Sequence, residues 1–107
     1  MASILIRSTP ARPKAGEEIK VQIVIMHPME PGTRRDSKGQ LIPADYISHL
    51  EVDFDGQLLA RMSPRGGVSA NPLFAFKMRA ERSGTVRVRY RDLKGETGEK
   101  ELKLTVV

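Results

Sequence analysis

The sequence contains two histidines, His27 and His49, and no cysteine. A serine hydrolase would need one of these imidazoles beside a nucleophilic serine and an acid, and no nucleophile-elbow sequence is present. The lack of cysteine excludes a thiolate nucleophile, a disulfide and a zinc–thiolate site. The residue types that carry catalysis are too few, so we predict a protein that is not an enzyme.

Methionines flank His27 on both sides, at Met26 and Met29. Thioether and imidazole are soft ligands that suit copper, and Met62 and Met78 would add to such a site. Methionine more often fills space in a core, so a periplasmic copper-binding β-sandwich is the alternative function and we predict no metal. A non-haem iron site of the superoxide reductase kind needs several histidines and a cysteine, which this sequence does not contain.

Basic residues exceed acidic ones, with 18 Lys and Arg against 13 Asp and Glu, which gives a formal net charge of +5. Arg87, Arg89 and Arg91 alternate along one segment and predict a basic stripe on one face of a strand. A nucleic-acid surface would also place stacking aromatic side chains among these arginines, but Tyr90 falls on the opposite phase. We predict that the stripe faces solvent and that nucleic acid is not a partner.

Seven short segments alternate apolar and polar residues with a period of two, which is typical of strands that bury one face. Between two of them, Asp55-Gly56 indicates a tight hairpin, because glycine tolerates positive φ. The predicted strands cover residues 3–7, 19–26, 47–54, 57–60, 74–80, 86–91 and 102–106. This pattern predicts a single all-β domain over residues 1–107, an immunoglobulin-like antiparallel β-sandwich, with a small barrel as the alternative.

The phase of this alternation predicts which side chains face outward. His49 falls on the outer phase of its strand and is expected to be exposed. Val24 and Met26 place apolar residues on the second face of their strand, which indicates that this end is covered on both sides. Val24 and the pair Leu58-Leu59 also indicate an apolar outer patch of the kind that marks interfaces, so a homo-oligomer in the absence of a partner chain is a further expectation.

Two long irregular stretches, residues 27–46 and 63–72, interrupt the strand pattern. Loops this long are uncommon in compact domains and are often functional. In the first, Arg34-Arg35-Asp36 indicates either a solvated turn or a guanidinium fork for a carboxylate or sulfur oxyanion. In the second, Gly66-Gly67 lacks the glycine spacing, the lysine and the following helix of a phosphate-binding loop.

The residues of these two loops resemble a known family. The run from His27 to Asp36, followed by Gly39 and Leu41-Ile42-Pro43, resembles the signature of SoxZ, the smaller subunit of the SoxYZ carrier in bacterial thiosulfate oxidation. The run Val68-Ser69-Ala70-Asn71-Pro72 resembles a second SoxZ signature, and the resemblance covers essentially the whole chain. Two positions depart from it, because Leu73 stands where an aromatic residue is expected and Tyr90 where more bulk is expected.

The resemblance implies a non-catalytic, immunoglobulin-like subunit that binds SoxY and needs no cofactor. SoxY holds sulfur intermediates on a cysteine at the end of a C-terminal arm, where the other Sox enzymes act on them. SoxZ has no signal sequence and is exported to the periplasm with SoxY, which agrees with the absence of a signal-peptide or membrane-spanning pattern here. Membrane and nucleic acid are not expected as partners.

We predict that six loop residues lie near the partner or its arm. In this prediction the two arginines favour the anionic sulfur adduct, the serine and asparagine bond the backbone of the arm, and the histidine orients its loop. The predicted partner-binding residues are His27, Met29, Arg34, Arg35, Ser69 and Asn71.

Overall fold

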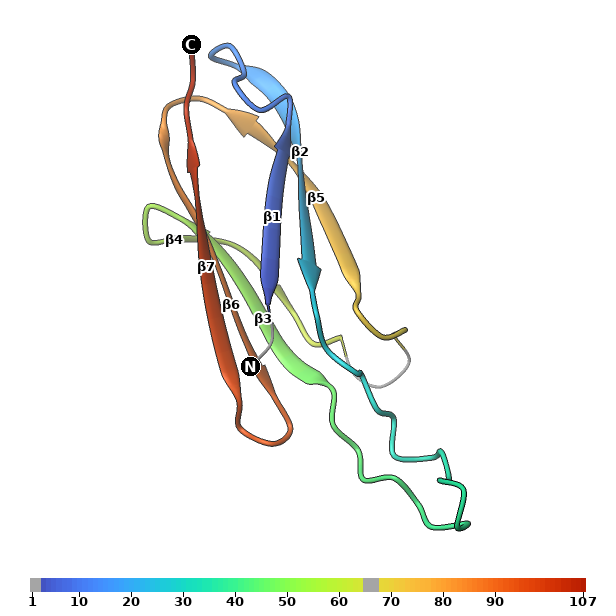
Figure 1. Ribbon diagram of the computed structural model, residues 1–107. Helices are drawn as coiled ribbons and strands as arrows, with labels where there is room; N and C mark the ends of the chain where they lie inside the picture. Colours follow the sequence, from blue (N-terminus) through green and yellow to red (C-terminus); the bar gives the residue numbers. More distant parts are fainter. Residues whose placement is uncertain (1–2, 65–67) are drawn as a thin grey trace.

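Seven β-strands in two antiparallel sheets make up the protein (Figure 1), as seen in a computed structural model that describes residues 3–64 and 68–107. The predicted all-β immunoglobulin-like sandwich is confirmed, and the described residues contain no helix. Gly66-Gly67, which the sequence did not favour as a phosphate-binding loop, lies outside the described residues. The strands are β1 (Ile4–Thr9), β2 (Glu17–Ile25), β3 (Ile47–Phe54), β4 (Gln57–Met62), β5 (Leu73–Ala80), β6 (Gly84–Asp92) and β7 (Thr97–Leu104).

The strand order is β1-β2-β5 in one sheet and β4-β3-β6-β7 in the other. Strands β3 and β4 form the hairpin predicted at Asp55-Gly56, with Phe54 paired to Gln57 across a two-residue turn. Both turn residues have positive φ, 49° for Asp55 and 86° for Gly56, which is the backbone of a type I′ turn and matches the right-handed twist of the strands.

The core lies between the two sheets and is made by the inward phase of the alternating strands. Most of its side chains are β-branched or leucine, because β-branched residues pack well on a pleated surface. Tyr90 is 3% exposed, and His49 is exposed on the outer phase as predicted. The buried apolar residues are Ile4, Ile19, Val21, Ile23, Ile25, Met29, Ile47, Leu50, Val52, Phe54, Ala80, Val86, Val88, Tyr90 and Leu104.

The outer face of the three-stranded sheet carries an uncovered apolar row. Leu5, Val24 and Leu73 are direct neighbours across β1, β2 and β5. Leu5 and Leu73 are 63% and 58% exposed, and Met26 just beyond β2 is 47% exposed. The expectation that this end of β2 is covered on both faces is therefore wrong for the chain by itself, since no described element packs over the row.

Three connections, β2–β3, β4–β5 and β6–β7, lie at the same end of the sandwich (Figure 1). The β2–β3 connection extends well beyond the sheets, so the molecule measures 56 × 21 × 19 Å. Its radius of gyration is 16.0 Å, against about 13 Å for a compact chain of this length. Within residues 3–64 and 68–107 there is no helix long and apolar enough to cross a membrane.

Candidate functional site

An ordered arm, residues 28–46, takes the place of the predicted irregular loop. Its two sides pair as an antiparallel ribbon with bridges between Glu30 and Asp45 and between Arg35 and Leu41. At the first bridge, the amide of Glu30 donates to the carbonyl of Asp45 at 2.8 Å, and the amide of Asp45 returns the bond at 2.9 Å. Beyond its buried base at Met29 and Asp45, the ribbon buries neither face. Backbone pairing of this kind needs no apolar periodicity, which explains why the sequence pattern did not reveal it.

The tip of the arm is closed by an aspartate turn. The carboxylate Oδ1 of Asp36 accepts from the amides of Lys38 at 2.9 Å and Gln40 at 3.0 Å. The amide of Asp36 donates to the carbonyl of Gln40, and Gly39 supplies the positive φ of 79° that the turn needs. The tip therefore holds its shape through its own hydrogen bonds.

The β6–β7 connection repeats this turn. Oδ1 of Asp92 accepts from the amides of Lys94 at 3.0 Å and Glu96 at 2.9 Å, and Gly95 has a φ of 81°. The two turns share the pattern Asp-x-Lys-Gly-x, with an aspartate that caps the amides two and four residues ahead. They differ in burial, because Asp36 is exposed and Asp92 is 3% exposed.

The two predicted arginines of the arm have separate partners. Arg34 forms an ion pair with Glu30, four residues earlier, which lowers the pKa of the Glu30 carboxyl and raises that of the guanidinium through their hydrogen bond. Arg35 donates to the carbonyl of Gly39 at 2.7 Å and so braces the tip turn. Both side chains are exposed, but they do not converge into one fork for a single anion.

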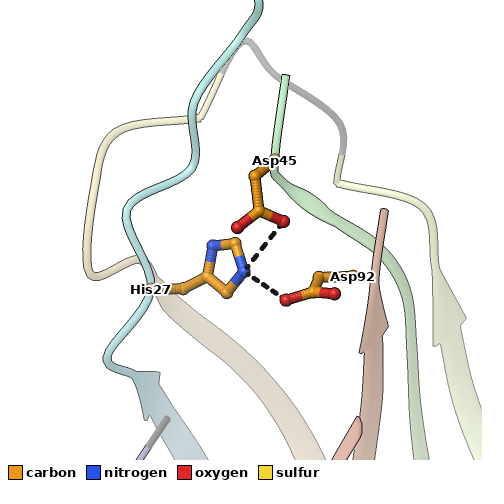
Figure 2. A group of neighbouring side chains, drawn as sticks. All are labelled: His27, Asp45 and Asp92. Atoms are coloured by element: carbon orange, nitrogen blue, oxygen red, sulfur yellow. Dashed lines mark hydrogen bonds and ion pairs between the residues drawn. The ribbon is translucent and has the colours of Figure 1, made fainter. Parts of the chain in front are cut away.

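His27 is the centre of a buried junction at the base of the arm. It is 4% exposed and lies between Asp45 and Asp92 (Figure 2). Its Nδ1 accepts the amide of Met29 at 3.0 Å, so the ring proton resides on Nε2. Nε2 then donates to Asp92 Oδ2 at 3.0 Å and lies 3.8 Å from Asp45 Oδ1. We call His27, Asp45 and Asp92 the junction; it ties both ends of the arm to the β6–β7 turn.

The junction has the residue types of a metal site, since its three possible ligand atoms lie within 4.8 Å of one another. A metal on Nε2 would require the remaining ring proton on Nδ1. That position already accepts the Met29 amide, and Lys94 Nζ lies 3.8 Å from Asp45 Oδ2. The geometry therefore favours a hydrogen-bonded clamp over a cation site.

The copper alternative required Met26, His27 and Met29 to converge. Met26 is 47% exposed, whereas Met29 is 2% exposed and its sulfur accepts the amide of Ile47 at 3.4 Å. Met26 points outward, whereas His27 and Met29 point inward, and side chains on opposite faces of an extended segment point in opposite directions. These three residues therefore do not form one ligand set. The copper-binding interpretation loses its structural basis.

Asn71 joins the second loop to the junction. Its amide donates to the carbonyl of His27 at 2.8 Å, and its Oδ1 accepts the amide of His27 at 3.1 Å. Asn71 adopts a φ of 51°, a left-handed conformation that asparagine tolerates better than most residues. The two loops singled out in the sequence are thus in direct contact, although 44 positions separate the two residues.

The six predicted residues fall into two groups. His27 and Met29 are buried, so any part they play in partner binding is to hold the arm. Arg34, Arg35, Ser69 and Asn71 are exposed, and for these four contact with a partner stays a prediction. Sequence reasoning missed Asp45 and Asp92, which lie far along the chain from His27. One available signal was that His27 continues the inward phase of β2, where a polar side chain needs a buried partner.

The fold and the junction together define a small immunoglobulin-like sandwich that projects an ordered arm. A family model described as "Sulphur oxidation protein SoxZ" matches residues 6–103, nearly the whole chain. The chain therefore belongs to the SoxZ family of sulfur-oxidation proteins, as the loop signatures indicated.

Solved structures share the fold at low sequence identity. A superoxide reductase (neelaredoxin) from Ignicoccus hospitalis is 18% identical, with a TM-score of 0.68, over 98% of this chain and 80% of that one. The superoxide reductase from Nanoarchaeum equitans is 19% identical, with a TM-score of 0.65, over 95% and 91%. The sulfur carrier protein SoxY from Chlorobium limicola f thiosulfatophilum is 14% identical, with a TM-score of 0.64, over 97% and 78%. No curated protein sequence matches the chain.

Proposed function

We propose that this protein is the non-catalytic subunit of a sulfur-carrier heterodimer in thiosulfate oxidation. Its partner is a SoxY subunit that carries sulfur intermediates on a C-terminal cysteine. The observation that carries the proposal is the SoxZ family match over residues 6–103. The sequence has two histidines and no cysteine, which agrees with a non-catalytic role. The cysteine that carries the sulfur must then belong to another chain.

The arm is the proposed docking element. It extends from a rigid base, and exposed polar side chains held on a fixed backbone are typical of binding loops. Arg35 and Lys38 present positive charge near its tip, whereas the charge of Arg34 is offset by Glu30. Asn71 uses its amide and Oδ1 on His27, which leaves its Nδ2 group to donate to the backbone of a partner.

Co-expression with a SoxY subunit and size-exclusion chromatography test the pairing. We expect a single peak that contains both chains in equal amounts at micromolar concentration. Two separate peaks would contradict the heterodimer.

A charge-matched pair of variants tests the arm. Arg34→Ala with Arg35→Ala should weaken pairing or carrier turnover by about tenfold, since interface charges of this kind contribute roughly 1–2 kcal/mol. Arg12→Ala with Lys14→Ala removes the same charge from the β1–β2 turn at the opposite end. This control should leave pairing and carrier turnover unchanged. Equal effects of the two double variants would show that only net charge matters.

The proposed location is the periplasm, reached by export with SoxY. The resemblance of the loops to SoxZ supports this, because family members travel with the partner that carries the signal. Fractionation of cells that express this chain with and without SoxY tests it, and recovery from the periplasm in both cases would contradict co-export.

A further inference from the structure

The outer face of the four-stranded sheet carries a regular charge ladder. Arg87 and Arg89 on β6 each lie directly between two acidic residues, one on β3 and one on β7. Ion pairs of 3.4–4.0 Å connect these rows. The neighbours are Asp53 and Glu101 for Arg87, and Glu51 and Glu99 for Arg89. Two of the three stripe arginines are therefore neutralised by their neighbours.

Arg91 breaks this pattern. Its direct neighbours are His49 on β3 and Thr97 on β7, neither of which is acidic. All three side chains are exposed, and in the described parts of the chain Arg91 makes no ion pair. This row thus combines one uncompensated guanidinium with an imidazole and a hydroxyl, all of which can donate to an anion.

A surface groove of about 230 Å³ opens at this row. Its lining consists of His49, Glu51, Arg89, Tyr90, Arg91 and Thr97. Glu51, the acidic member, is 3.3 Å from Arg61 Nε and 3.7 Å from Arg89 Nη2, so its charge is already paired with two arginines other than Arg91. The groove is large enough for a group of four or five heavy atoms and retains a positive end at Arg91.

A β-bulge aims His49 at this groove. The register of β3 shifts between Ile47 and His49, and bulges commonly redirect a side chain next to a binding site. The hydroxyl of Ser48 donates to the carbonyl of Arg91 at 3.1 Å. Because that donation uses its only proton, His49 Nδ1, 3.1 Å from the same oxygen, is the donor of their bond. His49 Nε2 is the nitrogen left for a ligand.

We propose that this groove binds an oxyanion. Arg91 donates to it through its guanidinium, Thr97 through its hydroxyl and His49 through Nε2 when the ring is protonated. The ligand is either a free oxyanion such as sulfate or thiosulfate, or a sulfonate group carried on a partner's chain. Binding of a free oxyanion does not depend on the proposed function, whereas a carried sulfonate rests on it, and co-elution with SoxY tests neither.

The His49 contribution makes binding tighter in acid. Its neutral ring, with the proton on Nδ1, presents an acceptor at Nε2, and only the imidazolium donates there. The charged groups that face it are Glu51 on its own strand and Arg89 and Arg91 on β6; Thr97 on β7 is uncharged. Affinity for an oxyanion should therefore be higher when His49 is an imidazolium than when its ring is neutral.

Titration of the full chain with sodium sulfate, followed by amide and histidine ring chemical shifts in NMR spectra, tests the site. We expect saturable shifts at His49, Arg91 and Thr97. Arg91→Gln should weaken binding about tenfold or more, since a charge-assisted hydrogen bond is lost. Arg87→Gln, on the same strand and face but between two acids, should leave it unchanged. Equal weakening by both variants, or shifts that do not saturate, would overturn the proposal.

Two probes distinguish the sources of the oxyanion. Sodium thiosulfate represents the free ion, and a short glycine-rich peptide with an S-sulfonated cysteine represents a group on a partner's chain. Tighter binding of the peptide than of either ion, lost in Arg91→Gln, assigns the groove to a carried sulfonate. Equal affinity for all three assigns it to free oxyanions. Binding of the peptide that survives Arg91→Gln contradicts the groove as its site.

Discussion

At the scale of single residues, His27 connects four segments of the chain. Its ring joins Met29, Asp92 and Asp45, and its backbone joins Asn71. Buried hydrogen bonds to a charged group contribute more than exposed ones, because water cannot replace them. The junction should accordingly stabilise the whole loop end of the sandwich rather than one turn.

The repeated aspartate turn offers a matched test of the junction. Asp92→Ala removes both the turn cap and the acceptor of His27, and should lower the free energy of unfolding by about 2–4 kcal/mol. Asp36→Ala removes the same cap in an exposed turn and should cost less than about 1 kcal/mol. Urea unfolding of both variants measures the difference, and equal costs would show that the His27 bond contributes nothing.

At the scale of elements, Asp55 connects the β3–β4 hairpin to Arg82, before β6, and to Thr85, at the start of β6. Asp55 Oδ1 accepts the amide of Thr85 at 2.8 Å, and Oδ2 lies 2.5 Å from Arg82 Nη1. The Thr85 amide and then Arg82 lower the pKa of the Asp55 carboxyl. A folded pKa below the unfolded one stabilises the native state above the unfolded value, and this stabilisation is lost as the pH falls through the folded value.

Asp55→Asn should therefore be less stable than the parent at neutral pH, and the difference should shrink below about pH 4. Asparagine tolerates the positive φ of Asp55, so the turn backbone is preserved. Urea unfolding at several pH values measures the effect. Glu81 is an exposed carboxylate in the same region, so Glu81→Gln is the control. It should not change how the free energy of unfolding depends on pH. A constant difference at all pH values would contradict the role assigned to the Asp55 charge.

Six strands and the β3–β4 hairpin could be predicted closely from the sequence, because a one-sided core imposes period two and Asp-Gly imposes the turn. The seventh strand was expected at residues 102–106 but runs over Thr97–Leu104, since most of its side chains are exposed and give no alternating signal. The arm could not, because its pairing is carried by backbone groups and its side chains beyond the base are mostly exposed. The junction was also missed. Asp92 follows His27 by 65 positions, and only the folded topology brings the β6–β7 turn beside β2. Two local signals existed, namely the inward phase of His27 and the repeated Asp-x-Lys-Gly turn.

At the scale of the whole molecule, the arm and the sandwich are separable. Met29 and the junction lie at the base of the arm, and no core residue lies beyond them. A Cβ on Gly32 would lie 2.9 Å from the Cβ of Ala44, so the two sides are close enough there for a short turn to replace residues 33–43. Such a replacement keeps both the Glu30–Asp45 bridge and the junction.

Replacement of residues 33–43 by Asn-Gly should leave the sandwich folded, with a melting temperature within a few degrees of the parent, since the removed surface is exposed. Small-angle X-ray scattering should show a maximum dimension clearly below that of the 56 Å parent. If the arm docks SoxY, co-elution should be lost at the same time. Retained co-elution by the folded variant would assign docking to another surface.

The internal hydrogen bonds of the arm have a consequence for the thermodynamics of association. A loop that is disordered when free loses conformational entropy on binding, at roughly 1–2 kcal/mol for each residue that becomes fixed. The arm has its bridges, its tip turn and its anchorage at His27 before any partner arrives, so most of that entropy is lost during folding instead. Contacts along the arm therefore translate more fully into affinity, and binding should show a small heat-capacity change confined to the surface that is newly buried.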